Sequence, residues 1–175
     1  PCSESMTGPD FDALCRLAAD VGAACRARGW RLATAESCTG GLVSAAVTSV
    51  AGSSDWFDRG FVTYSNAAKS DLLGVNPALC AQVGAVSPEV ARAMALGARQ
   101  RAGVEVAVAV TGIAGPGGGS VEKPVGTVWF GLAWKEGDAV RSETRHALFK
   151  GDRDSVRLQA AEFALRWLLQ AAQRS

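Results

Sequence analysis

The chain has 175 residues, of which 48% are hydrophobic and 20% are charged. That composition is typical of one globular domain and excludes a disordered chain, and a net charge of +1 argues against nucleic acid as the main partner. No apolar run reaches the roughly 18 residues that cross a bilayer, and no signal-peptide pattern opens the chain, so we expect a cytoplasmic protein with no membrane partner.

Residues 1–9 are polar, and we expect a flexible segment there followed by a domain at 10–175. Hydrophobic periodicity, helix caps and glycine-rich breaks divide the rest of the chain into alternating elements. In chain order, the predicted elements are a helix at 10–27, a strand at 31–35, a helix at 39–50, a strand at 60–64, helices at 66–73 and 88–102, strands at 104–111, 126–134 and 139–149, and a helix at 152–172.

The segment 104–111 is nearly all Val and Ala, the pattern of a strand buried on both faces of a sheet. A glycine-rich loop from Gly112 to Ser120 follows it. Because helices and strands interleave along the whole chain, we predict a single three-layer α/β/α domain with a mixed sheet.

The first candidate site is the passage from strand to turn to helix at residues 36–41, which contains Ser37, Cys38, Thr39 and Gly40. A helix start leaves backbone N–H groups unpaired, and these favour a phosphate or a developing oxyanion. Ser37 would present its hydroxyl there as a nucleophile. The alternative is that Ser37 or Thr39 only caps the helix, which is worth about 1 kcal/mol.

A serine nucleophile needs a base, and the only histidine is His146, in the strand predicted at 139–149. Lys69 follows Tyr64 by five residues at the next strand-to-helix passage, and a lysine of lowered pKa or a tyrosine can serve instead. The alternative for Lys69 is a solvated surface side chain. Cys38 is a rival nucleophile as a thiolate, against the alternative of a buried structural cysteine.

Two further segments are candidates for ligand binding. The glycine-rich loop follows a strand's carboxyl end, where open α/β sheets bind ligands, although a flexible connection is the alternative. Arg153 stands near the start of the last helix, where it either pairs with the flanking Asp152 and Asp154 or binds a phosphate. The five cysteines are scattered without a Cys-x-x-Cys pair, so neither a disulfide framework nor a metal site is indicated.

Six motifs together resemble the CinA C-terminal domain family, from about residue 10 to residue 172. They are TAESCTGG (34–41), GFVTYSNAAK (60–69), GAVS (84–87), TGIAGPGGGS (111–120), KPVGTV (123–128) and GDR (151–153). The resemblance implies a nicotinamide mononucleotide amidohydrolase of the bacterial pyridine nucleotide cycle. Such an enzyme forms nicotinate mononucleotide and ammonia without a metal or cofactor, and the resemblance also implies a homo-oligomer, with a homodimer the expected form.

The resemblance also implies roles for individual residues. Ser37 corresponds to the nucleophile, with Tyr64 and Lys69 assisting it. The remaining positions correspond to substrate binding: Cys38, Thr39, Gly40, Thr111, Gly112, Ala114, Gly115 and Arg153. Two alternatives stay open: a nucleotide-binding or regulatory module that keeps the pocket without catalysis, and a competence or DNA-damage-associated protein.

Overall fold

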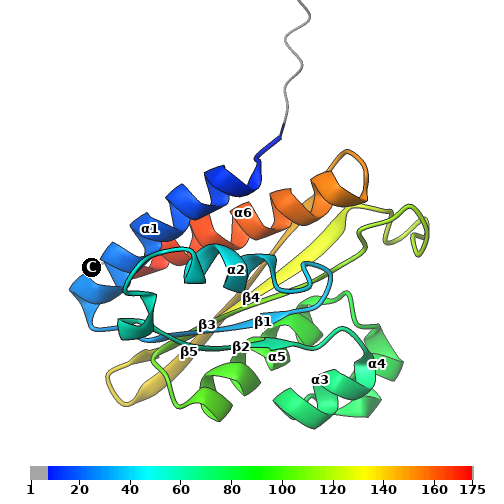
Figure 1. The fold of residues 1–175 in the computed structure, drawn as a ribbon. Coiled ribbons are helices and arrows are strands. Elements are labelled where there is room, and N and C mark those ends of the chain that lie inside the picture. Colours follow the sequence, from blue (N-terminus) through cyan, green and yellow to red (C-terminus); the bar gives the residue numbers. More distant parts are fainter. Residues whose placement is uncertain (1–7, 175) are drawn as a thin grey trace, which may run out of the picture.

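The computed structural model describes residues 8–174, so that most of the segment expected to be flexible, residues 1–7, lies outside the described residues. Figure 1 shows the arrangement of the elements. The helices are α1 (Phe11–Arg28), α2 (Leu42–Thr48), the 3₁₀ turn η1 (Ser53–Asp55), α3 (Asn66–Leu73), α4 (Pro77–Val83), α5 (Pro88–Ala102) and α6 (Arg153–Ala172). The strands are β1 (Leu32–Glu36), β2 (Phe57–Val62), β3 (Val106–Gly112), β4 (Thr127–Glu136) and β5 (Ala139–Leu148).

The strands form one sheet in the order β2-β1-β3-β4-β5. β2, β1 and β3 are parallel to one another, whereas β4 and β5 run antiparallel to their neighbours. The mixed sheet predicted from the sequence is therefore confirmed. Because parallel strands end at the same edge, the residues that follow β2, β1 and β3 lie next to one another.

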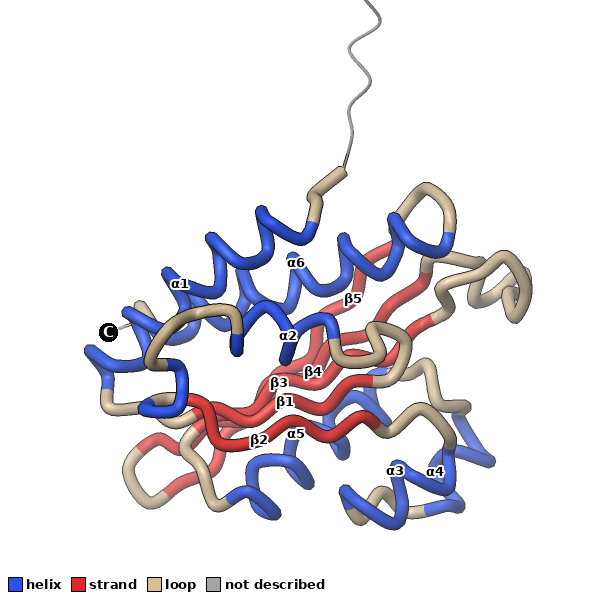
Figure 2. Tube along the Cα trace, in the orientation of Figure 1, coloured by secondary structure: helices blue, strands red, loops and turns tan. Residues whose placement is uncertain are grey.

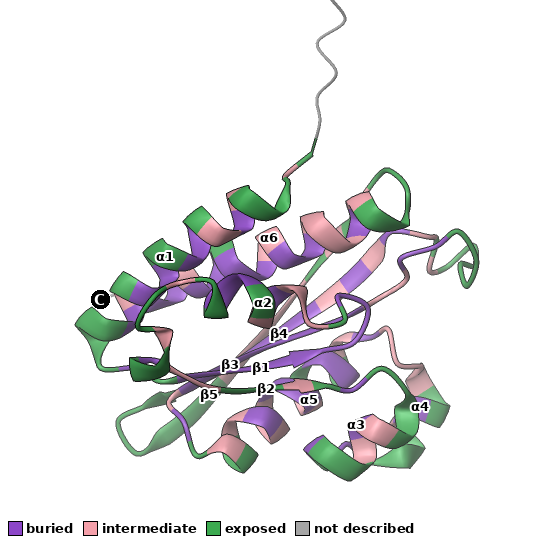
Figure 3. Ribbon diagram, viewed as in Figure 1, coloured by how far each residue is buried: buried purple, intermediate pink, exposed green. Residues whose placement is uncertain are grey.

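Helices cover both faces of this sheet, which confirms the three-layer arrangement (Figure 2). α1, α2 and α6 pack on one face, and α3, α4 and α5 pack on the other. Each helix layer has its own hydrophobic core against the sheet. The central strands β1 and β3 are almost wholly buried, whereas the edge strands β2 and β5 are largely half-buried or exposed (Figure 3).

The alternation of residue size along β3 explains how the two cores differ. Val108 and Val110 belong to the core beneath α1 and α6, whereas Ala107 and Ala109 belong to the core beneath α5. Small side chains on the α5 face allow that helix to approach the sheet closely. The predicted strand at 104–111 is thus confirmed as one buried on both faces.

Four elements differ from the sequence predictions by three residues or more, and one of them is the 3₁₀ turn η1, which has no predicted counterpart. Helix α4 has no counterpart among the predicted elements, although Asn76 caps it and Pro77 opens it. Helix α2 begins three residues later than predicted, because Gly40 and Gly41 adopt positive φ angles of 58° and 108° that a right-handed helix excludes. Strand β2 begins at Phe57 rather than at residue 60, since its pairing with β1 extends it backwards.

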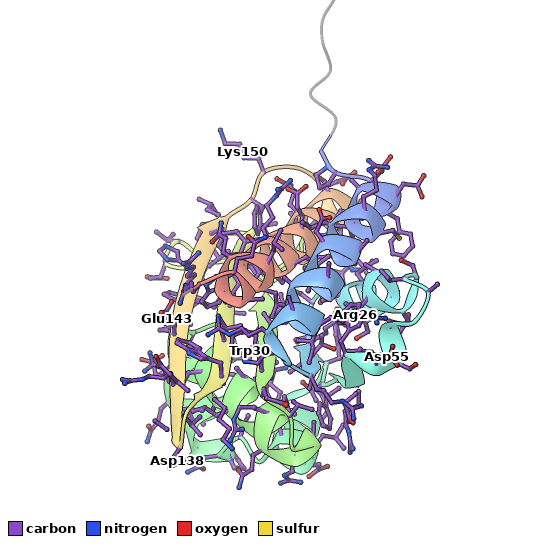
Figure 4. The ribbon with its side chains drawn as sticks, turned by 90° about the vertical axis from the view of Figure 1, so that its left-hand side faces the viewer. Arg26, Trp30, Asp55, Asp138, Glu143 and Lys150 are labelled. Carbon is purple, nitrogen blue, oxygen red and sulfur yellow. The ribbon has the colours of Figure 1, made fainter. Side chains whose placement is uncertain are left out.

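At the surface, an ion pair joins α1 to the segment that precedes β2 (Figure 4). Arg26 lies 3.1 Å from the carboxylate of Asp55 and also donates to the carbonyl oxygen of Gly52. Exposed pairs of this kind contribute little to stability. Among residues 8–174, no helix is long and apolar enough to cross a membrane.

Candidate active site

Ser37 occupies the first position after β1, in a tight turn that leads into α2. Its backbone N–H donates to the carbonyl oxygen of Val110 in β3, and its own carbonyl oxygen accepts from the N–H of Gly40. Its side chain is nearly buried, with the residue 7% exposed. The backbone of the turn is therefore tied to the sheet, and the serine hydroxyl projects at the edge where the parallel strands end.

Lys69 reaches the same edge from the neighbouring strand-to-helix passage. Ser65 caps α3 by accepting from the N–H of Ala68, so only three residues separate the end of β2 from α3, which carries Lys69 in its first turn. The lysine is 1% exposed. Its Nζ lies 3.1 Å from Ser37 Oγ, and it contacts the carbonyl oxygens of Thr63 at 2.8 Å and Tyr64 at 3.2 Å. Lys69 is thus not a solvated surface residue.

The surroundings of Lys69 disfavour its charged form. Burial lowers the pKa of the Lys69 amine below its usual value of 10.5, because the ammonium loses its hydration. Within residues 8–174, no carboxylate lies within ion-pair distance of Nζ, and Cys80 and Cys38, which raise the pKa of Lys69, each have a smaller effect than burial. The structure therefore combines the contact and the pKa direction that a lysine base requires.

Tyr64 contributes both its backbone carbonyl group and its side-chain hydroxyl to the site. Its backbone carbonyl oxygen contacts Lys69, and Ser37 Oγ lies 3.5 Å from the same oxygen. Its side chain is exposed, and its hydroxyl accepts a hydrogen bond from Nη2 of Arg153 at 3.1 Å. Nη1 of Arg153 donates to the carbonyl oxygen of Gly115 at 2.7 Å. Arg153 thus links Tyr64 to the glycine-rich loop.

These residues surround a cavity of about 250 Å³ at the carboxyl edge of the parallel strands. Eleven residues line it: Ser37, Cys38, Tyr64, Asn66, Lys69, Ala85, Val86, Thr111, Gly112, Ala114 and Arg153. Of the site residues expected from the sequence, only Thr39, Gly40 and Gly115 are not among them. Asn66, Ala85 and Val86 were not anticipated as lining residues, although the motifs at 60–69 and 84–87 contain them. Thr111 Oγ1 donates to the carbonyl oxygen of Ala85.

The rival candidates of the sequence lie in unfavourable positions. Cys38 is buried, and burial raises the pKa of its thiol to about 12, which opposes a thiolate near neutral pH. His146 lies in β5, where its ring stacks on Trp129 with centroids 4.7 Å apart, and it does not line the cavity of Ser37.

Two charged residues that the sequence did not mark as functional also contact the serine turn. Glu36 ends β1 and is buried, and its carboxylate accepts from the backbone of α2. Arg157 lies one helical turn after Arg153 and donates to the carbonyl oxygens of Cys38 and Thr39. The GDR motif contains Arg153 but not Arg157, so the sequence motif did not identify the second arginine.

Among the described residues, no group of three or more His, Cys, Asp or Glu side chains is placed to hold a metal ion.

Comparison with known proteins places this geometry in a family. The nicotinamide-nucleotide amidohydrolase PncC of Enterobacter agglomerans is 58% identical over 153 residues, covering 87% of this chain and 92% of that protein. PncC of Escherichia coli is 54% identical over 157 residues, covering 90% of this chain and 93% of the relative. The crystal structure of the competence/damage inducible protein CihA from Agrobacterium tumefaciens superimposes with a TM-score of 0.85 at 43% identity, covering 96% of this chain and 99% of that one. Residues 14–172 match the model of the CinA C-terminal domain, and the chain belongs to that family.

Proposed function

We propose that this protein is a nicotinamide-nucleotide amidase, which hydrolyses the carboxamide of nicotinamide mononucleotide to nicotinate mononucleotide and ammonia. The observation that carries the proposal is the 3.1 Å contact between Lys69 Nζ and Ser37 Oγ at the edge of a cavity of about 250 Å³. The PncC relatives support the choice of substrate, because they are more than half identical to this chain over most of its length.

Activation of Ser37 follows from the acceptors around Lys69. A neutral amine has two N–H groups and one lone pair. The carbonyl oxygens of Thr63 and Tyr64 accept the two N–H groups, which turns the lone pair toward the Ser37 hydroxyl. Lys69 then accepts the serine proton as the general base. The Tyr64 side chain, held by Arg153, serves substrate binding, and only its backbone carbonyl assists the proton transfer.

The attack of Ser37 Oγ on the carboxamide carbon gives a tetrahedral oxyanion. The N–H of Gly40 is already bonded to Ser37, so the N–H groups of Cys38 and Thr39 are the groups in the turn assigned to the oxyanion. The Lys69 ammonium protonates the leaving nitrogen, and ammonia departs from an acyl-enzyme. Water then attacks the acyl group with Lys69 again as base, releasing nicotinate mononucleotide and restoring Ser37.

The substrate phosphate is assigned to the Arg153 end of the cavity. The guanidinium is exposed, and its present partners are a neutral hydroxyl and a neutral carbonyl, so its charge is available to an anion. The backbone N–H groups at the start of α6 contribute less to phosphate binding than the sequence suggested, because the N–H of Ser155 already donates to the Asp152 carboxylate. We place the reaction in the cytoplasmic recycling of pyridine nucleotides.

The test is release of ammonia from nicotinamide mononucleotide by the purified protein, with and without a chelator. No step passes through a metal, so we expect the same rate in both. Ser37→Ala should abolish turnover, and Lys69→Met should lower kcat by about 100-fold or more while the substrate still binds. Full activity of Ser37→Ala would contradict the nucleophile. Binding of the mononucleotide by the wild-type protein without ammonia would instead identify a non-catalytic binding module.

A further inference from the structure

The buried carboxylate of Glu36 lies directly behind the turn that carries Ser37. The residue is 1% exposed, and its two oxygens accept four hydrogen bonds. Oε1 accepts from Thr39 Oγ1 at 2.7 Å and from the N–H of Val43 at 2.9 Å. Oε2 accepts from the N–H of Ser44 at 3.0 Å and from Ser44 Oγ at 2.8 Å. Glu36 therefore joins the end of β1, the turn and the first residues of α2.

The pattern of these bonds requires a carboxylate. Each carboxylate oxygen accepts from one backbone N–H, and a backbone N–H can only donate. A glutamine at this position would have an NH₂ group in place of one oxygen. In either orientation of the amide, that NH₂ group would face one of the two N–H groups, and neither could accept from the other. The Ser44 hydroxyl is also restricted to one orientation, because its proton is donated to Glu36 Oε2. Thr34 Oγ1 lies 2.8 Å from Ser44 Oγ, so the Thr34 hydroxyl is the donor in that contact. An unpaired polar group in this buried place would displace the turn.

Arg157 holds the other side of the same turn. Its Nε donates to the carbonyl oxygen of Cys38 at 3.1 Å, and its Nη2 lies 3.3 Å from the carbonyl oxygen of Thr39. A Cβ on Gly40 would meet the guanidinium at 3.3 Å, so the turn and Arg157 are fitted closely. In a planar trans peptide, fixing the carbonyl oxygens also fixes the direction of the N–H groups of Thr39 and Gly40.

We propose that Glu36 and Arg157 form a charged clamp that positions Ser37 and its neighbouring backbone for the reaction. Neither residue touches the reacting atoms, so both are positioning residues. This inference rests on the proposed function, because it assumes that Ser37 is the nucleophile. Its chemical basis is that the Ser37 Oγ to Lys69 Nζ contact spans two chain segments, and a shift of about 1 Å at such a contact costs about 100-fold in rate.

The first experiment measures kcat, KM and thermal unfolding for Glu36→Gln, Glu36→Asp and the control Glu136→Gln. Glu136 is an exposed carboxylate at the end of β4, far along the chain from the turn. We expect Glu36→Gln to lower kcat by about 100-fold with KM little changed. Glu36→Asp should recover part of that loss because it keeps the charge and both acceptors, and Glu136→Gln should match the wild type. Wild-type kcat in folded Glu36→Gln would overturn the clamp.

The second experiment measures the reactivity of Ser37 without the nucleotide. A fluorophosphonate forms a serine–phosphorus bond and releases fluoride, and mass spectrometry follows the modified peptide. We expect labelling of Ser37 to slow in Glu36→Gln and in Arg157→Met, and Arg157→Lys to recover little because one ammonium lacks the planar fork that contacts two carbonyls. Should Glu36→Gln fail to fold, the labelling rates of Arg157→Met and Arg157→Lys decide the matter.

These readouts separate the two proposals. A wild-type protein that releases no ammonia from nicotinamide mononucleotide, yet is labelled at Ser37, contradicts the proposed substrate alone, and the clamp is then judged on the labelling rates. Labelling of Arg157→Met and of folded Glu36→Gln at the wild-type rate contradicts the clamp, whatever the substrate.

Discussion

Lys69 shows how one buried side chain sets the pH range of the proposed reaction. Below its pKa the amine carries a proton and cannot accept another from Ser37, and above its pKa the lone pair is free. Because burial lowers this pKa from its usual 10.5, the active form is populated at lower pH than in an exposed lysine. We expect kcat/KM to rise with pH through the Lys69 pKa and to be lost as pH falls through it.

A pH–rate profile of ammonia release checks this expectation. Lys69→Arg is the matched variant, since arginine keeps a positive charge but does not lose its proton in this range. It should lower the plateau rate by about 100-fold or more. A wild-type profile that is flat from acid to alkaline pH would contradict Lys69 as the base.

Cys38 shows the opposite effect of burial on a neighbouring group. The pKa of its thiol is raised to about 12 by burial, so the thiol stays protonated near neutral pH. We expect Cys38→Ala to retain most of the activity and the wild-type Cys38 to resist alkylation by iodoacetamide, as followed by peptide mass spectrometry. A loss of turnover comparable to that of Ser37→Ala would revive the thiolate mechanism.

At the scale of the elements, the close approach of α5 to the sheet depends on residues without side chains. A Cβ on Gly131 in β4 would overlap the backbone carbonyl oxygen of Ala91 in α5, and neither backbone can yield without moving its element. We expect Gly131→Ala to lower the free energy of unfolding by about 1–3 kcal/mol, as overpacked cores do. Urea unfolding followed by circular dichroism measures the change.

The matched control is Gly117→Ala in the glycine-rich loop. A Cβ there would have no neighbour within 4 Å, and the backbone of Gly117 does not need a positive φ angle. Its free energy of unfolding should differ little from that of the wild type. Equal unfolding midpoints for the two variants would show that α5 adjusts to the added methyl group.

At the scale of the whole molecule, the sheet separates two cores, and the larger one holds α6 in place. Phe130 of β4 is 0% exposed and stacks on Phe163 of α6, with ring centroids 4.2 Å apart. We expect Phe130→Ala to cost about 3–5 kcal/mol of unfolding free energy, because it leaves a cavity between sheet and helix. Val121→Ala, at a side chain that is 96% exposed, is the control and should be neutral.

Denaturant unfolding tests this prediction, with ammonia release measured alongside it. Because Arg153 and Arg157 lie at the start of α6, a weakened contact between α6 and the sheet should also raise KM before the protein unfolds. A destabilisation below about 1 kcal/mol would contradict this prediction and would mean that the core repacks around the lost ring.

Much of this structure could be predicted from local patterns. The alternation of helical and strand periodicity indicated three layers, and the run of Val and Ala at 104–111 indicated a strand buried on both faces, because both patterns reflect which side of an element faces a core. The same reasoning missed α4, a seven-residue helix whose main signals are its Asn76 cap and Pro77. It also began α2 too early, since it did not allow for the two glycines at positive φ.

The sequence by itself determined which groups are available for chemistry: a serine after a strand, a lysine after the next strand, one histidine in another part of the chain, and an ordered set of motifs. Only the tertiary structure decided that Lys69 and Ser37, separated by 32 positions, touch; that Tyr64 directs its hydroxyl to Arg153; and that Glu36 is buried behind the turn. The physical reason is that strand order and burial set contact and pKa between distant residues, whereas periodicity reports only on neighbours along the chain.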